Sequence, residues 1–174
     1  MPLLHKLKKQ NRKEGRCVII RPSRYEDYEQ LVELENLIWN DENTPLVIEW
    51  ETAEEYAQHV PPGSLFVAIH EGRVAGYISV KNPTMLESNR HVWELAIGVH
   101  PDLGRRGTGS RLLAHIEEKG RMMNIRKICL RVLATNERAI SFYEKNGYLH
   151  QGRLVEEFLI GGKYVDDCLM YKLL

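Results

Sequence analysis

The chain has 174 residues, 43% of them hydrophobic, and its 24 Lys and Arg balance its 24 Asp and Glu. This length and composition predict one globular domain with a sizeable core. The apolar runs are too short and too interrupted by charge to span a bilayer. The first residues also lack the apolar centre of a signal peptide, so we expect a cytoplasmic protein without membrane contacts.

The charges are sorted along the chain. Residues 1–24 carry eight Lys or Arg and one acid, whereas residues 25–72 carry twelve Asp or Glu and no Lys or Arg. We expect residues 1–15 to be a basic arm, which either contacts nucleic acid or an acidic partner or is only a solvated tail. Residues 16–174 are expected to form the domain. Residues 25–72, the acidic block, either line a cleft that attracts cations or form a solvated surface. Because acids repel phosphate, this block disfavours nucleic acid as a partner.

The first half of the chain predicts one strand, two helices and a hairpin. Thr52 is placed to cap the second helix. In the first helix, apolar residues recur at helical spacing and form one buried stripe: Tyr28, Leu31, Leu34, Leu37 and Ile38. Glu71 and Gly72 separate two apolar runs, as in a tight hairpin turn. In order, we expect a strand over residues 17–22, helices over 25–39 and 52–60, and strands over 64–70 and 73–81.

The second half predicts strands that alternate with helices before a final pair of strands. We expect a strand over residues 91–99, a helix ending near 123, a strand over 127–132, a helix over 136–147, and strands over 148–160 and 163–174. The complete order is β-α-α-β-β-β-α-β-α-β-β. Because hairpins and helical crossovers both occur, the fold class is α/β with a mixed central sheet flanked by helices.

Cysteine and histidine give no sign of a disulfide framework or a metal site. Cys17, Cys129 and Cys168 are odd in number, far apart and each within a predicted strand. We therefore expect reduced core residues. The seven His residues show no paired ligand spacing, so we expect no metal.

The segment VHPDLGRRGTGSRLL, residues 99–113, joins a predicted strand to a predicted helix. Gly107 and Gly109 allow a tight turn, which leaves unpaired N–H groups at the helix start. These groups, the helix dipole and the nearby arginines attract phosphate. The alternative is that the glycines form only a tight connection.

Two common phosphate loops do not fit this turn. A Walker loop requires Lys followed by Ser or Thr, but Gly109 precedes Ser110 and Arg111. The dinucleotide-binding pattern G-x-G-x-x-G follows the first strand of its unit, whereas these glycines have the reverse spacing and lie late in the chain. A nucleotide triphosphatase and a Rossmann oxidoreductase are both disfavoured.

The order of elements and this turn resemble the GNAT superfamily of acyl-CoA-dependent N-acetyltransferases, over nearly the whole chain after about Cys17. The family has a mostly antiparallel mixed sheet, and its Gln/Arg-x-x-Gly-x-Gly/Ala turn binds the coenzyme A pyrophosphate. Gly104 occupies the Gln or Arg position here, and the adjacent arginines supply charge nearby. The resemblance implies that the residues binding acetyl-CoA are Ile97, Gly98, Val99, Gly104, Arg105, Arg106, Gly107, Thr108, Gly109, Ser110, Asn136 and Tyr143.

A second block, NERAISFYEKNGY, is similar to the distal motif of the family. By that resemblance, Asn136 hydrogen-bonds the pantetheine arm and Tyr143 faces the acetyl sulfur, where it protonates the departing thiolate. From the residues alone, Tyr143 forms an apolar helical stripe with Ala139 and Ile140. It could equally be a core aromatic residue with a satisfied hydroxyl.

An alkyl amine, with a pKa near 10.4, must lose a proton before it can attack a thioester. Glu94 lies just before the turn, about where family members often carry a catalytic carboxylate, and we predict that it is the base. The alternative role of Glu94 is a cross-strand ion pair. A backbone N–H near Val99 would stabilise the tetrahedral oxyanion.

The predicted function is acetyl transfer from acetyl-CoA, without a metal, to a primary amine. The acidic block favours a cationic acceptor such as a polyamine, an amino sugar or a basic peptide. The alternative function is a module that binds or senses coenzyme A with little or no turnover. The sequence also allows a homodimer.

Overall fold

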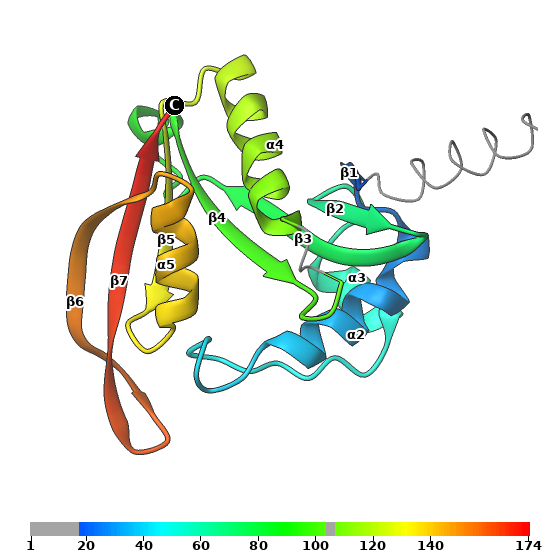
Figure 1. Cartoon of the computed structure of the whole chain (residues 1–174), viewed down its shortest axis with the longest axis horizontal. Coiled ribbons are helices and arrows are strands. Elements are labelled where there is room, and N and C mark those ends of the chain that lie inside the picture. The colour runs from blue at the N-terminus through cyan, green and yellow to red at the C-terminus, as the bar shows by residue number, and fades with distance from the viewer. Residues whose placement is uncertain (1–17, 104–106) are drawn as a thin grey trace, which may run out of the picture.

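The computed structural model describes residues 18–103 and 107–174, which form a seven-stranded sheet with helices on both faces (Figure 1). The basic arm, Cys17 and residues 104–106 lie outside the described residues. The elements are β1 (Ile19–Pro22), η1 (Tyr25–Asp27), α2 (Tyr28–Ile38), α3 (Ala53–His59), β2 (Leu65–His70), β3 (Arg73–Lys81), η2 (Glu87–Asn89), β4 (Val92–Val99), α4 (Thr108–Met122), β5 (Lys127–Leu133), α5 (Glu137–Lys145), β6 (Leu149–Ile160) and β7 (Lys163–Leu173).

The strands lie in the order β1-β2-β3-β4-β5-β7-β6. Every neighbouring pair is antiparallel except β4 and β5, which are parallel because α4 connects them as a crossover. The predicted order of helices and strands is confirmed, and so is the mixed, mostly antiparallel sheet. The structure adds two 3-10 turns, η1 and η2, to the predicted order of elements.

The parallel pairing of β4 with β5 is short. It consists of three residue pairs, from Val92 opposite Lys127 to Glu94 opposite Cys129. Both strands continue beyond the last pair, to Val99 and Leu133, without pairing with each other, and Figure 1 shows them diverging. Backbone polar groups on the facing edges therefore lack ladder partners. The sheet is open at its centre.

Side chains on the two faces of the sheet belong to two separate cores. Successive residues of a strand point to opposite faces. Val67 and Tyr77 pack with residues of α2 and α3, whereas Ala68 and Ile78 pack with residues of α4 and α5. The two pairs of helices consequently cover opposite faces, and the opening between β4 and β5 lies between them.

Local sequence signals account for several element boundaries. Thr52, the predicted cap, accepts a hydrogen bond from the Glu55 N–H at 3.1 Å and starts α3. Glu71 and Gly72 have φ values of 50° and 78°, which suit the two-residue turn between β2 and β3. Within the described residues, Cys129 on β5 is half-buried, Cys168 on β7 is buried, and both are free thiols. Within the described ranges, every helix is too short or too polar to cross a membrane.

The turn η1, which leads into α2, depends on a buried carboxylate. Asp27 is 4% exposed; its carboxylate accepts hydrogen bonds from both Arg21 Nη atoms at 2.7 Å and from the Arg24 N–H at 2.8 Å. Burial opposes ionisation of this group, but the hydrogen bonds outweigh burial and lower the pKa of Asp27. The ionised side chain thus joins β1 to η1, the 3-10 turn that precedes α2.

We expect Asp27→Asn to lower the free energy of unfolding by about 2 to 3 kcal/mol, because the part-buried Arg21 guanidinium loses its partner. The stabilisation is present above the unfolded-state pKa of about 3.9 and is lost as pH falls through the lower folded-state pKa. The difference in free energy of unfolding between the wild type and Asp27→Asn should therefore be smaller near pH 3 than at neutral pH, as measured by urea unfolding. Glu26→Gln is the control, because this exposed carboxylate should contribute about 0.5 kcal/mol or less. Equal effects of the two substitutions would contradict the assignment.

Candidate active site

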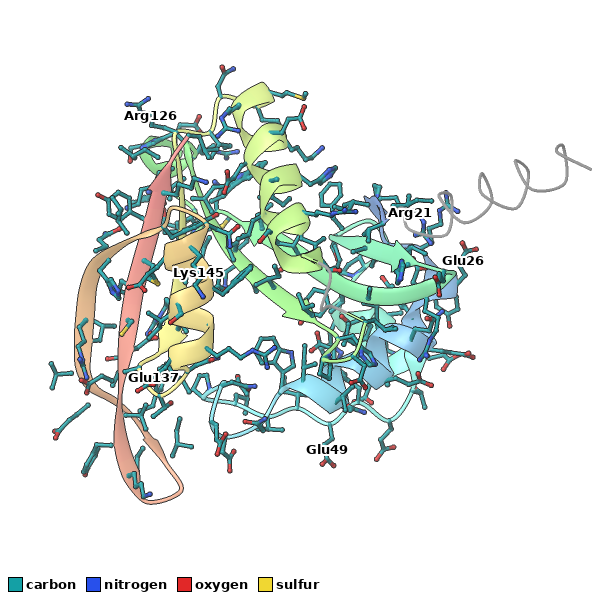
Figure 2. All side chains as sticks on the ribbon, viewed as in Figure 1. Arg21, Glu26, Glu49, Arg126, Glu137 and Lys145 are labelled. Carbon is teal, nitrogen blue, oxygen red and sulfur yellow. The ribbon has the colours of Figure 1, made fainter. Side chains whose placement is uncertain are left out.

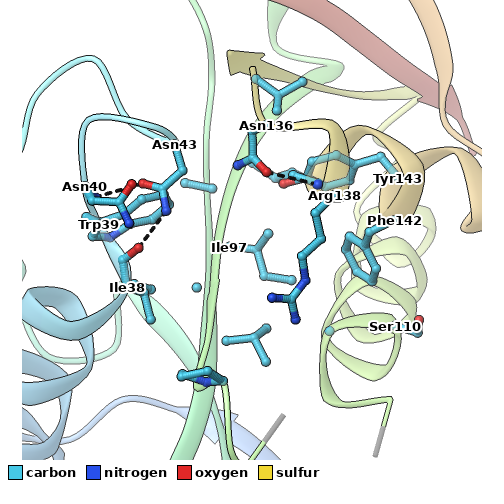
Figure 3. A pocket seen from close by; sticks show the side chains of 18 of the residues that line it. Ile38, Trp39, Asn40, Asn43, Ile97, Ser110, Asn136, Arg138, Phe142 and Tyr143 are labelled. Carbon is cyan, nitrogen blue, oxygen red and sulfur yellow. Dashed lines mark hydrogen bonds between the residues drawn. The ribbon is translucent and has the colours of Figure 1, made fainter. Parts of the chain in front are cut away.

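A cavity of about 610 Å³ occupies the opening between β4 and β5. Its walls come from the end of α2 and the following loop, from β4, from the start of α4, and from β5 and α5 (Figure 3). The lining residues are Leu37, Ile38, Trp39, Asn40, Asn43, Leu95, Ala96, Ile97, Gly98, Val99, Pro101, Gly107, Gly109, Ser110, Arg131, Val132, Asn136, Arg138, Ala139, Phe142 and Tyr143.

The β4 wall contains the predicted strand residues Ile97, Gly98 and Val99. A Cβ atom at Gly98 would lie 2.5 Å from Tyr77 Cε1 and 2.6 Å from Ile38 Cδ1. Glycine is therefore required here, because these two side chains pack directly against the strand. The result is a wall in which the β4 backbone itself borders the cavity.

The start of α4 forms the second wall. Gly107 is the N-cap residue with φ 77°, and its carbonyl accepts the first hydrogen bond of the helix from the Arg111 N–H. The N–H groups of Thr108, Gly109 and Ser110 therefore have no partner within the helix. Gly107, Gly109 and Ser110 line the cavity, whereas buried Thr108 does not. The predicted anion-binding turn faces the cavity as far as it is described; Gly104, Arg105 and Arg106 lie outside the described residues.

Gly109 also allows α4 and α5 to approach closely. A Cβ atom at this position would lie 2.9 Å from Phe142 Cζ on α5. Gly109 therefore allows the helices to pack closely in addition to forming the turn. An anion-binding role and a purely structural role for this glycine are thus compatible. A bulky substitution at Gly109 would disturb both.

The start of α5 forms the third wall. Asn136 caps this helix, because its Oδ1 atom accepts a hydrogen bond from the Ala139 N–H at 3.1 Å. Tyr143 lies two turns along the same helix, 7% exposed, with its ring against Phe142 and Tyr148. Both predicted residues, Asn136 and Tyr143, line the cavity.

Tyr143 is a core residue that also lines the cavity. Burial raises the pKa of Tyr143, and among the described residues no hydrogen bond satisfies its hydroxyl. The ring belongs to the core cluster that includes α4 and α5, as the alternative interpretation required. The side chain thus combines core packing with a hydroxyl at the cavity that no described residue hydrogen-bonds.

Glu94 is placed differently from the other predicted residues. It belongs to the last residue pair of the β4–β5 ladder, and the β4 residues that line the cavity begin at Leu95. Its Oε1 atom lies 3.2 Å from Nζ of Lys81, its cross-strand neighbour on β3. The structure shows the cross-strand ion pair that was the alternative role, and it does not bring the Glu94 carboxylate into the cavity wall.

Sequence reasoning missed an acidic residue behind the α2 wall. Burial raises the pKa of the Glu35 carboxyl, and hydrogen-bonding groups of three aromatic side chains offset only part of the rise. These side chains are Tyr77, Trp39 and Trp50. Among the described residues, no cation contributes to this environment. The sequence feature that could have revealed Glu35 is its position within the apolar helical stripe, between Leu31 and Ile38.

Two further residues of the cavity also escaped the sequence analysis. Leu37, expected on the buried stripe of the first helix, is 53% exposed and lines the cavity instead. Arg138, the second residue of α5, extends between Ile97 and Phe142 (Figure 3). In the part of the chain that the structure describes, no group of three His, Cys, Asp or Glu residues could hold a metal.

The acetyltransferase (GNAT) family model matches residues 25–148. Spermidine N(1)-acetyltransferase of Escherichia coli K12 is 29% identical over 158 residues, or 84% of this chain and 81% of that protein. An acetyltransferase of Sodalis glossinidius is 30% identical over 85% of this chain and 96% of its own length. The structure of smu.2055 from Streptococcus mutans has a TM-score of 0.78 at 28% identity, covering 89% of this chain and 98% of that one. The family match includes both diverging strands and both helix starts at the cavity, and the chain therefore belongs to the GNAT family of acetyltransferases.

Proposed function

We propose that the chain transfers an acetyl group from acetyl-CoA to a primary amine that is a cation in solution. The observation that supports this proposal is the cavity between β4 and β5. One of its walls has N–H groups at the start of α4 that lack a partner within the helix, and another has the hydroxyl of Tyr143, which no described residue hydrogen-bonds. The first feature suits a phosphate and the second suits a leaving group that gains a proton.

This arrangement orients the coenzyme. Its pyrophosphate would accept hydrogen bonds from the N–H groups of Gly109 and Ser110. The pantetheine arm would then follow β4 beyond Glu94, where the backbone lacks pairing with β5. Asn136, at the start of α5, is placed to hydrogen-bond the arm. The thioester would reach Tyr143 at the far end of this path.

The reaction then follows from the groups present. A neutral amine attacks the thioester carbonyl, a C–N bond forms, and the C–S bond breaks as the thiolate leaves. A backbone N–H near Val99 would stabilise the oxyanion, and Tyr143 would give its proton to the thiolate. Glu94 remains the predicted base. Because its carboxylate pairs with Lys81 outside the cavity wall, a water must carry the amine proton to it.

Several observations favour a cationic acceptor. Asp41 and Glu42 are exposed beside Asn40 and Asn43, which line the α2 side of the cavity. Other acids of the block surround α2 and the loop after it; Figure 2 shows Glu26 and Glu49 extending from this region. Glu35 adds a part-buried carboxylate without a cation among the described residues. The relative from Escherichia coli is named for a polyamine, spermidine, which is itself a cation.

Substitution of Ser110, the exposed cavity residue in the first turn of α4, tests coenzyme binding. Acetyl-CoA at ~100 times its Kd should stabilise the wild-type protein by about 2.7 kcal/mol. Ser110→Asp should abolish this thermal shift, because the new carboxylate repels the pyrophosphate. The unliganded melting temperature should not fall, since an acid near a helix start is favourable. Ser110→Ala should bind normally because the backbone N–H is retained. Normal binding by Ser110→Asp would show that phosphate lies elsewhere.

Tyr143→Phe tests the proton donor while keeping the ring in the core. We expect kcat with the best amine to fall by up to about 10²-fold, the lower end for loss of a general acid. The effect is limited because the raised pKa of Tyr143 makes it a weak acid. The melting temperature and the Kd for acetyl-CoA should change little. An unchanged kcat would leave Tyr143 as a core residue only.

A panel of amines, with thiol release as the readout, tests the acceptor and separates catalysis from mere coenzyme binding. Spermidine, an amino sugar and a basic peptide should react faster than an acidic amine such as glutamate. Higher salt should raise the KM for the cation, because exposed charges are screened over about 8 Å at physiological ionic strength. A coenzyme-sensing module would bind acetyl-CoA but release no thiol with any amine.

Glutamine substitutions at two glutamates of α2 then test whether an acid behind the α2 wall attracts the acceptor. Glu35→Gln should raise the KM for the cationic amine about tenfold while the thermal shift with acetyl-CoA stays unchanged. Glu33→Gln, at an exposed position of the same helix, is the matched control and should leave both unchanged. Equal KM values for Glu35→Gln and the wild type would remove Glu35 from acceptor recognition.

A further inference from the structure

The cavity carries an unbalanced positive charge. Its described lining includes two guanidinium groups, from Arg131 and Arg138, and no carboxylate. Arg131 is neutralised, because its Nε atom lies 2.5 Å from Asp167 Oδ2 and its Nη2 atom lies 3.1 Å from Glu157 Oε1. Arg138 forms no ion pair with any described acid. The charge on Arg138 is therefore available to a ligand.

The position of Arg138 in its helix is unfavourable without such a ligand. It is the second residue of α5, directly after the cap residue Asn136 and Glu137. A cation near the start of a helix is repelled by the positive end of the helix dipole. Glu137 lies in the same turn but makes no ion pair with it within the described residues. An anion bound beside Arg138 would relieve this repulsion.

The side chain of Arg138 is directed into the cavity. Figure 3 shows it extending from α5 between Ile97 on β4 and Phe142 on α5. Phe142 contacts the start of α4, since a Cβ atom at Gly109 would lie 2.9 Å from its ring. The guanidinium and the free N–H groups of α4 thus border the same cavity from two different helices.

We infer that Arg138 binds a phosphate group of the coenzyme, together with the start of α4. This inference rests on the proposed use of acetyl-CoA. A guanidinium offers a fork of donors that matches two phosphate oxygens, and charge-assisted hydrogen bonds of this kind are among the strongest in proteins. The phosphate turn has Gly104 where its family has Gln or Arg. Arg138 supplies from α5 a side-chain contact that Gly104 cannot make.

Two parts of the coenzyme carry this chemistry, the pyrophosphate and the 3′-phosphate of the ribose. Titration calorimetry with coenzyme A, 3′-dephospho-coenzyme A and pantetheine distinguishes them. Arg138→Gln should weaken coenzyme A binding by about 10- to 100-fold, in line with a charged hydrogen bond. The loss should persist with 3′-dephospho-coenzyme A if the pyrophosphate is bound, and vanish if the 3′-phosphate is bound. Pantetheine, which has no phosphate, should show no loss in either case.

Lys145→Gln is the matched control, because Lys145 is exposed at the opposite end of the same helix (Figure 2). It should bind coenzyme A as the wild type does, and Arg138→Lys should lose less than Arg138→Gln. The unliganded melting temperature of Arg138→Gln should be unchanged or higher, because the repelled cation is gone.

Three results would overturn the inference. Arg138→Gln could weaken coenzyme A binding by less than twofold, or it could weaken pantetheine binding equally. The third is a collapsed melting curve of Arg138→Gln together with unchanged coenzyme A binding by Arg138→Lys. Failure of the proposed function gives a different result, because the wild-type protein itself would then either not bind coenzyme A or bind it without releasing thiol with any amine.

Discussion

The parallel pairing of β4 with β5 ends after three residue pairs, and every feature of the cavity depends on that ending. Had the ladder continued to Val99 and Leu133, the backbone groups of both strands would be paired and the space between them closed. Because it stops at Glu94 and Cys129, one strand edge borders an opening inside an otherwise continuous sheet. Helices on both faces then supply the remaining walls without having to separate from their cores.

The opening divides the charges of the protein into two regions. Two helices, α4 and α5, begin at the cavity with their caps Gly107 and Asn136, so the positive ends of two dipoles and the guanidinium of Arg138 lie on one side. The other side is formed by α2 and its following loop, within the segment that has no Lys or Arg. An anionic donor and a cationic acceptor would thereby be attracted to different walls of one cavity, which suits a reaction that joins them.

The motif residues could be predicted because each depends on local chain geometry. Gly107 permits the left-handed cap of α4, and Asn136 caps α5 through its own side chain. Tyr143 follows at helical spacing, so its direction is set once α5 packs. Glu94 was different: whether it faces the cavity or Lys81 depends on where the pairing of β4 and β5 stops, and no local pattern encodes that position.

By itself, the sequence determined the order of helices and strands, the glycine turn before α4, the cap of α5 and the segregation of charge, because periodicity and turn chemistry act over a few residues. Only the tertiary structure decided which of these features share a cavity. It placed the Arg138 side chain between Ile97 and Phe142, partly buried Glu35 beside aromatic side chains, and exposed Leu37 at the cavity wall. Those outcomes depend on contacts between elements distant in the chain, and the physical reason is that burial and charge compensation are properties of a neighbourhood rather than of a residue.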